Sequence, residues 1–164
     1  MHVFDTALGP VGVEWSEAGI SEVLMPGRRG LVDDGRVLAP AIAEAVAGIA
    51  ALLAGERRDL TDIPLDDGDV DEFRRRVYAA TREIGPGETA TYGEIARAIG
   101  DPGAARAVGA ALGANPFPIV IPCHRVLAAD GALHGFSAPG GIATKQRMLE
   151  IECAPGFTQG SLFA

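Results

Sequence analysis

The sequence predicts an α/β (α+β) protein, with a small N-terminal three-stranded antiparallel sheet and one helix, followed by a mostly helical part that contains a helix-turn-helix. Short apolar runs separated by glycine-containing turns occupy residues 2–25, and later apolar residues recur at helical spacing. An acidic connector, residues 56–70, separates the two parts. We therefore expect an N-terminal scaffold domain with its connector over residues 1–69 and a C-terminal domain over residues 70–164.

The N-terminal elements are predicted from turns and spacing. Turns at Gly9-Pro10 and at residues 17–19 divide residues 2–25 into three runs, which is typical of an antiparallel meander. Residues 40–54 carry apolar side chains at helical spacing, and their leading proline suits a first helical turn. No residue pattern in this part indicates catalysis, so we interpret it as a scaffold.

Three helices are predicted after the connector. Residues 71–84 have an apolar stripe, and the turn that ends them leads to Thr91, which can cap a helix over residues 92–99. Glu94 lies three residues later, as a capping box requires. A Gly-Asp-Pro-Gly turn then joins a helix over residues 104–114, and two short helices joined in this way predict a helix-turn-helix.

The second helix of this motif has one apolar face and one nearly bare face. The apolar residues are Val108, Ala111 and Leu112, and the opposite face holds Arg106, Gly109, Ala110 and Gly113. A bare face allows a backbone to approach closely, which suits the minor groove of DNA better than side-chain recognition in the major groove. The same pattern also fits an alanine- and glycine-rich helix packed inside a core, and the sequence leaves both interpretations open.

The charge of the chain is unevenly distributed. The formal net charge is −8, which argues against a nucleic-acid binder, but residues 1–88 carry all of it, with 9 basic and 17 acidic residues. Residues 89–164 carry 5 of each and are neutral. This half can approach a phosphate backbone without strong electrostatic attraction.

The sequence indicates a cytoplasmic protein without a membrane association. No apolar run has the length of a membrane span, and no signal peptide is recognisable. The two cysteines make no disulfide framework, and the three histidines show no metal-ligand spacing, so we expect no metal.

The segment over residues 119–126 carries the candidate chemistry. An apolar, extended run ends at Pro122 and is followed by Cys123, His124 and Arg125. Neighbouring histidine or arginine can lower the pKa of a cysteine and populate the nucleophilic thiolate. The alternative is a small buried cysteine at a strand end. Because only about eight residues separate the bare helix from this cysteine, the sulfur could act on a base that has left the duplex.

The remaining C-terminal residues predict a hairpin, a loop and a helix. A tight hairpin is expected around Asp130-Gly131, and a glycine-rich loop suited to wall a pocket follows over residues 134–141. The last predicted helix covers residues 142–152, and the tail beyond it has no periodicity.

These motifs together resemble a known family. Pro122 to Val126, preceded by residues 115–121 and by Ala105 to Gly109, resembles the O6-alkylguanine-DNA alkyltransferases, or methylated-DNA–protein-cysteine methyltransferases. The match runs from about Phe73 to Glu152. It implies direct-reversal repair by a monomer that binds the minor groove of double-stranded DNA, flips an O6-alkylguanine out of the stack, and takes its alkyl group once, without a cofactor.

The resemblance also implies roles for four catalytic residues. Cys123 would accept the alkyl group, His124 would act as general base through a bridging water, and Glu152 would orient that histidine. Glu150 remains an alternative to Glu152. Asn115 would fix the turn between the helix and the cysteine segment.

Substrate and DNA binding are implied for a second group of residues. Tyr92 would help to rotate the nucleotide, Arg106 would fill the space left by the base, and Ser137 would read the guanine edge with the carbonyl groups of Cys123 and Val126. The full set comprises Tyr92, Arg106, Gly109, Gly113, Arg125, Val126, Ser137 and Lys145.

Two positions depart from the family pattern, and two other functions compete with it. Ala138-Pro139 lengthens the pocket loop, and Phe136 stands where a tyrosine is common. Relatives that bind alkylated DNA without repairing it lack the cysteine, which is present here. A thiol hydrolase would place its histidine far from the cysteine in sequence. Some relatives bind zinc in the N-terminal half, but the required ligands are absent here.

Overall fold

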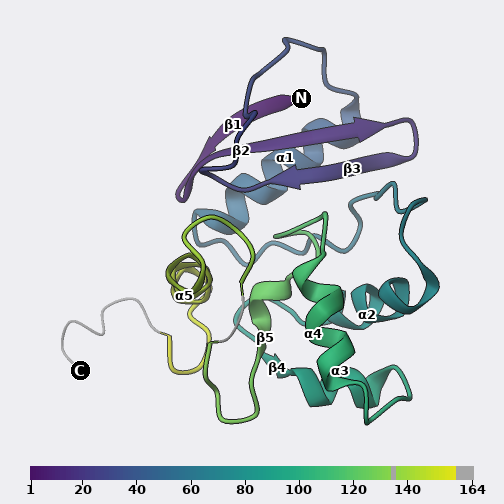
Figure 1. Cartoon of the computed structure of the whole chain (residues 1–164). Coiled ribbons are helices and arrows are strands. Elements are labelled where there is room, and N and C mark those ends of the chain that lie inside the picture. The colour runs from purple at the N-terminus through teal and green to yellow at the C-terminus, as the bar shows by residue number, and fades with distance from the viewer. Residues whose placement is uncertain (134–135, 158–164) are drawn as a thin grey trace, which may run out of the picture.

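A computed structural model describes residues 1–133 and 136–157 of the chain. Strands β1 (His2–Thr6), β2 (Gly9–Ser16) and β3 (Gly19–Leu24) form an antiparallel sheet in the order β1-β2-β3. Helix α1 (Pro40–Leu53) packs against this sheet (Figure 1). The predicted meander and its helix are therefore confirmed. The loop between β3 and α1 is bonded to the sheet, where the Val3 N–H donates to the Asp33 side chain.

The second part is mostly helical, as predicted. Figure 1 shows it below the sheet, with α3 and α4 forming the helix-turn-helix against α2. Its elements are α2 (Glu72–Arg82), β4 (Ala90–Thr91), α3 (Tyr92–Ala98), α4 (Ala105–Gly113), the 3-10 turn η1 (Cys123–Arg125), β5 (Val126–Leu127) and α5 (Ile142–Ile151).

Local side-chain contacts fix where these helices start. The Asp71 side chain accepts a hydrogen bond from the backbone N–H of Arg74 and caps α2. Thr91 and Glu94 form the predicted capping box at the start of α3. Strand β4 pairs in parallel with β5, with Ala90 opposite Val126, and this pairing brings the start of α3 beside the end of the cysteine turn.

The segment before Cys123 differs from the expected extended run. It is coiled rather than paired as a strand: Ile119 has a φ of 75°, and the Ile121 N–H donates to the Phe117 carbonyl at 2.8 Å. The Asn115 side chain stabilises this coiled conformation of the segment. It accepts a hydrogen bond from the Phe117 N–H and donates one to the Ile121 carbonyl. A left-handed conformation in a β-branched residue costs about 1–3 kcal/mol, so the surrounding packing must hold it in place.

The expected hairpin at Asp130-Gly131 is only partly formed. The Gly131 N–H donates to the Ala128 carbonyl, and the Ala128 N–H donates to the Ala132 carbonyl, so the chain turns there. The outgoing side of this turn is not a strand in the described residues, because β5 pairs with β4 instead.

The connector is bonded to both parts of the molecule. The Ile20 N–H donates to the Pro64 carbonyl at 2.9 Å, and the Arg82 guanidinium donates to the carbonyls of Leu60 and Ile63.

The sheet also contacts the second part directly, because the Val23 N–H donates to the Pro116 carbonyl at 2.9 Å. A single apolar core extends from the sheet to the helix-turn-helix. The N-terminal part is therefore packed directly against the cysteine segment.

Within residues 1–133 and 136–157, no helix is both long enough and apolar enough to cross a lipid bilayer.

The capping box yields a prediction about stability. Thr91→Ala should lower the free energy of unfolding by about 1 kcal/mol, because the first turn of α3 loses a side-chain acceptor. Thr91→Ser keeps the hydroxyl and should retain most of the stability. Urea denaturation followed by circular dichroism measures both changes, and equal midpoints for the alanine variant and the unmodified protein would contradict the role of this cap.

Candidate active site

Cys123 lines a cavity of about 270 Å³ and keeps 8% of its surface exposed. The cavity is walled by the end of α4, by the turn after it, by the loop around Phe136, and by residues of the N-terminal part. Cys123 is thus recessed, and solvent can still reach it through the cavity. Cys123 is buried, as the alternative of a small buried cysteine expects, but it begins a 3-10 turn and also lines this cavity.

A buried hydrogen-bonded chain lies next to the cysteine. His124 Nε2 is 2.8 Å from Glu152 Oε1, and the Arg125 guanidinium contacts both carboxylate oxygens of Glu152 at 2.8 Å. Arg125 also donates to the Ile84 carbonyl at 2.6 Å. The structure thereby distinguishes the two candidate carboxylates, because among the described residues the Glu150 side chain pairs with Gln146 and Arg147 and not with His124.

The environment sets the protonation of this chain. Burial lowers the pKa of His124, although Glu152 opposes the shift. Burial alone would raise the pKa of Glu152, but His124 and Arg125 outweigh it and hold that pKa at about 2. We therefore assign a neutral imidazole whose Nε2–H donates to an ionised carboxylate. Its Nδ1 remains an acceptor and has no hydrogen-bond partner among the described residues.

The thiol itself departs from the expected low pKa. Burial raises the pKa of Cys123, and the opposing effects come from the Asn115 side chain, the Lys145 charge and backbone N–H groups. The adjacent His124 and Arg125 do not stabilise the thiolate of Cys123 as expected, because Arg125 is paired with Glu152 and His124 is neutral. The resting cysteine is therefore a thiol, and a base must remove its proton before or during reaction.

Two cations expected among the substrate- and DNA-binding residues are located inside the protein. Arg125 and Lys145 are 5% and 1% exposed. Lys145 donates to the Val126 carbonyl at 2.6 Å, and its Nζ lies 5.8 Å from the centre of the Tyr92 ring. These contacts compensate for the burial of the charges. Neither side chain reaches the surface where DNA would lie, and both support the site from within.

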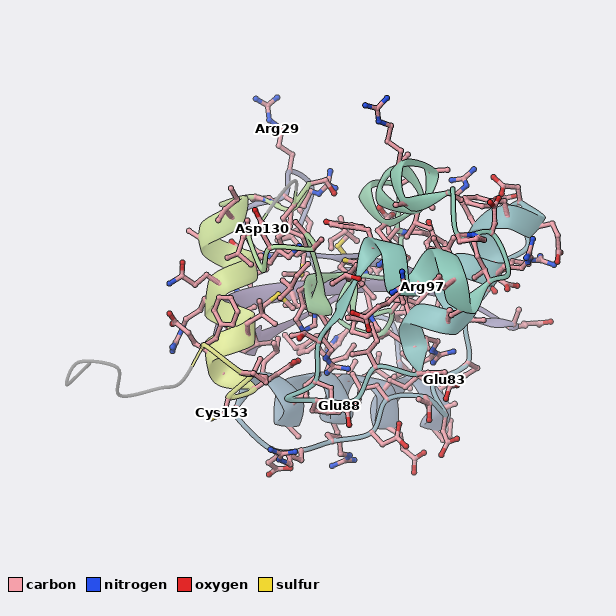
Figure 2. The ribbon with its side chains drawn as sticks, turned by 90° about the horizontal axis from the view of Figure 1, so that it is seen from below. Arg29, Glu83, Glu88, Arg97, Asp130 and Cys153 are labelled. Atoms are coloured by element: carbon pink, nitrogen blue, oxygen red, sulfur yellow. The ribbon has the colours of Figure 1, made fainter. Side chains whose placement is uncertain are left out.

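The small-residue helix lies on the surface. Val108, Ala111 and Leu112 of α4 are buried, whereas Arg106, Ala107, Ala110 and Gly113 are exposed. The interpretation of α4 as a fully buried core helix is therefore wrong. Gly109 is half-buried against Tyr92, whose ring atoms would lie 3.9 Å from a Cβ at this position. Helix α4 packs against α3. Figure 2, the view from below, shows Arg29 at one edge of the molecule and Glu83 and Glu88 well away from it.

Asn115 and Ser137 fix the two segments that flank the cavity. Asn115 holds the turn before the cysteine segment through its bonds to Phe117 and Ile121. The Ser137 hydroxyl donates to the Gly113 carbonyl at 3.0 Å, so the pocket loop is attached to the end of α4. The part of the predicted glycine-rich loop at residues 134–135 lies outside the described residues.

The N-terminal part contributes residues to the cavity that no sequence pattern predicts. Glu22, Val23, Met25 and Arg28 line it together with Cys123, about 100 positions later in the chain. No motif marks these residues, because their position depends on how β3 packs against the turn at Pro116. Only a long-range contact prediction could have found them.

Comparisons with known proteins agree on one family. The model of the 6-O-methylguanine DNA methyltransferase DNA-binding domain matches residues 72–154. A methylated-DNA–protein-cysteine methyltransferase of Mycolicibacterium paratuberculosis is 47% identical over 133 residues, which cover 81% of this chain and 76% of the relative. Another from Methanosarcina acetivorans is 39% identical over 92% of this chain and 96% of its own length.

Solved structures agree with these sequence matches. The crystal structure of Mycobacterium tuberculosis OGT in complex with DNA aligns with a TM-score of 0.77 and 37% identity, covering 98% of this chain and 96% of that one. The O6-methylguanine-DNA methyltransferase of Pyrococcus kodakaraensis aligns with a TM-score of 0.68 and 29% identity, covering 87% and 90%. With sequence, fold and site in agreement, the chain belongs to the methylated-DNA–protein-cysteine methyltransferase family.

Proposed function

We propose that this protein repairs O6-alkylguanine in double-stranded DNA by moving the alkyl group to the sulfur of Cys123. The observation that carries this proposal is a recessed cysteine followed by a buried, neutral histidine that a carboxylate orients. This is a nucleophile–base–orienter arrangement. Family membership adds support, because the matched segment contains Cys123, His124 and Glu152.

The reaction balances without a cofactor. The thiol S–H bond breaks as His124 Nδ1 takes the proton through a bridging water, and the sulfur attacks the alkyl carbon. A C–S bond forms while the bond from that carbon to O6 breaks. The electron pair of the broken bond stays on guanine, which takes up a proton from solvent, and the imidazolium of His124 then releases its proton to solvent. The stable thioether leaves no thiol at the acceptor position, so each molecule reacts once.

The pKa shifts of Cys123 and Glu152 favour this transfer of a proton to His124. A raised thiol pKa keeps Cys123 protonated until a base is aligned, while the low pKa of Glu152 keeps a negative charge beside His124. That charge stabilises the imidazolium that forms when the proton arrives. Arg125 holds the carboxylate in place from the opposite side.

DNA binding follows from the surface of α4. Its exposed small residues allow close approach to the minor groove, and Arg106 projects from the same face. We infer that Arg106 occupies the space of the flipped guanine and that Tyr92, packed against Gly109, guides the nucleotide. The neutral charge of residues 89–164 implies a modest salt dependence. We place this activity in the cytoplasm and assign it to a monomer.

Intact-mass measurement tests the acceptor. Incubation with duplex DNA that contains O6-methylguanine should add one methyl group to the protein, and Cys123→Ala should abolish the mass increase while binding persists. Cys153→Ala is the matched control, because Cys153 is the other cysteine and should not accept the group. Methylation of the Cys123→Ala protein would rule out this acceptor, and binding without any transfer by the unmodified protein would favour a lesion-binding function.

A comparison of two carboxylates tests the orienting role. Glu152→Gln leaves the buried Arg125 without its counter-ion and should lower the free energy of unfolding by about 3–5 kcal/mol. Glu150→Gln removes only a surface contact and should change it by less than about 1 kcal/mol.

The same pair of variants gives a pH test. The pKa of Glu152 is lower in the folded state, so its contribution is complete above its ordinary pKa of 4.5 and is lost as the pH falls toward about 2. Denaturant titrations from pH 7 to pH 3 should therefore show a weaker pH dependence in Glu152→Gln than in Glu150→Gln. Equal slopes would contradict a buried, ionised Glu152.

Arg106→Ala should impair the repair of duplex DNA more than the dealkylation of free O6-alkylguanine base. Only the duplex requires a base to be held out of the stack, which costs a few kcal/mol, so we expect a loss of about tenfold on duplex alone. Arg147→Ala on α5 is the control for the loss of a positive charge. Single-turnover rates on both substrates measure the effect, and parallel losses on duplex and free base would contradict the role in base flipping.

A further inference from the structure

We propose that Glu22 and Arg28, from the N-terminal part, form an outer subsite at the acceptor cavity that binds the far end of long O6 substituents and selects them by charge. This inference rests on the proposed alkyl transfer to Cys123. It adds a substrate class to that reaction, namely O6-alkyl groups larger than methyl that end in a charged group.

The cavity has an apolar interior and a charged rim. Val23 and Met25, which line it from β3 and the residue after it, are 4% and 2% exposed. Glu22 and Arg28 line the same cavity but are exposed to solvent. A substituent attached at Cys123 would therefore pass apolar side chains first and meet the two charges at its outer end. This change from an apolar interior to a charged rim suits a substituent made of a carbon chain or ring with a charged terminus.

The cavity has space for such a substituent in addition to the reacting carbon. Its volume of about 270 Å³ corresponds to roughly nine water molecules at about 30 Å³ each. Of the residues that we expect to contact the guanine, Cys123 and Ser137 line it, whereas Tyr92 and Val126 do not. The guanine edge therefore takes the part of the cavity beside Ser137, and the part beside Glu22 and Arg28 is available to the group carried on O6.

Both charged residues are held by ordered backbone. Glu22 lies in β3, opposite Glu14 of β2. Arg28 donates its N–H to the Met25 carbonyl at 3.2 Å and follows Gly27, whose φ is 87°. A side chain at position 27 would come within 3.0 Å of Pro139, so this close approach joins the Arg28 segment to the loop on the other side of the cavity.

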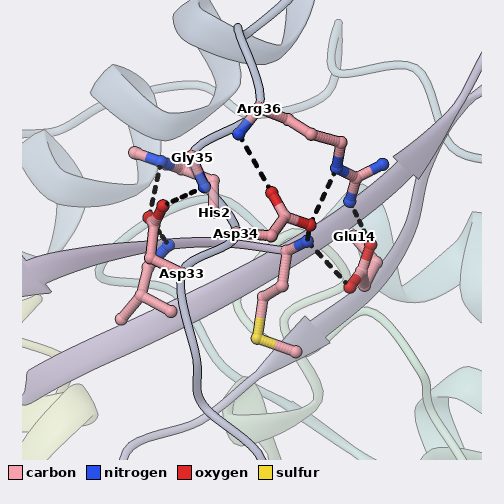
Figure 3. Close-up of polar contacts among 8 residues, drawn as sticks. His2, Glu14, Asp33, Asp34, Gly35 and Arg36 are labelled. Atoms are coloured by element: carbon pink, nitrogen blue, oxygen red, sulfur yellow. Dashed lines mark hydrogen bonds and ion pairs between the residues drawn. The ribbon is translucent and has the colours of Figure 1, made fainter.

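The segment after Arg28 is anchored as well. Figure 3 shows Asp33, Asp34 and Arg36 bonded to the first residues of the chain and to Glu14 of the central strand β2. The Val3 N–H donates to Asp33 at 2.8 Å, and Arg36 pairs with Glu14 at 2.6 Å. These contacts fix the outgoing end of the segment that carries Arg28. The backbone that carries Arg28 is therefore bonded on both sides of this residue.

Catalysis and charge selection are assigned to different parts of the chain. Cys123, His124 and Glu152 lie within the segment that matches the family model, residues 72–154. Glu22 and Arg28 lie outside it. The rim can therefore be altered without changing the nucleophile, the base or the orienting carboxylate, and this separation makes the proposal testable.

The test compares duplex oligonucleotides that differ only in the O6 group. One carries O6-(4-carboxybenzyl)guanine and the other O6-(4-aminomethylbenzyl)guanine, and the readout is the ratio of their single-turnover transfer rates. The ratio cancels effects on folding and on DNA binding. Arg28→Gln should lower the anionic-to-cationic rate ratio by about two- to fivefold, and Glu22→Gln should raise it by a similar factor, as expected for exposed charge pairs.

Matched controls lie close in the sequence. Arg29→Gln and Glu17→Gln remove the same charges at exposed positions that do not line the cavity, and they should leave the ratio unchanged. The effects of Arg28 and Glu22 should also shrink as salt is added. An unchanged ratio in both rim variants, or equal changes in the controls, would overturn the subsite. Absence of transfer from O6-methylguanine duplex by the unmodified protein would instead refute the proposed function.

Discussion

The carboxylate of Glu152, enclosed between His124 and Arg125, is the interaction on which the site depends. Burying one carboxylate, one guanidinium and one imidazole costs free energy unless each charge is paired and each hydrogen-bonding group is satisfied. Here the bidentate guanidinium neutralises the carboxylate, and the Ile84 carbonyl takes a further guanidinium N–H. The result is a neutral histidine with a fixed tautomer beside a protonated thiol, which allows proton removal to be coupled to alkyl transfer.

The N-terminal part contributes to the site through packing. Its sheet is bonded to the turn after α4, where the Val23 N–H meets the Pro116 carbonyl, and its core is continuous with that of the helix-turn-helix. The turn at Asn115 is held from one side by this sheet and from the other by its own side-chain bonds. This double support allows Ile119 to keep an unfavourable backbone conformation a few residues before Cys123.

The charged side chains are distributed between the surface and the interior in a way that the net charge does not reveal. The acidic excess belongs to residues 1–88, whereas the exposed face of α4 consists of small side chains and Arg106. Two of the cations in the neutral half, Arg125 and Lys145, are buried and pair with groups inside the protein. The DNA recognition that we propose therefore relies on shape at α4 more than on a basic surface.

The sequence by itself determined the sheet, the capping box at Thr91, the helix-turn-helix and the cysteine motif, because turns, caps and helical periodicity are local properties of the chain. Only the tertiary structure decided that α4 lies on the surface, that Glu152 and not Glu150 meets His124, and that Arg125 and Lys145 are buried. It alone placed Glu22 and Arg28 at the cavity. These facts depend on contacts between residues far apart in sequence, and on the cost of burying charge, which no local pattern encodes.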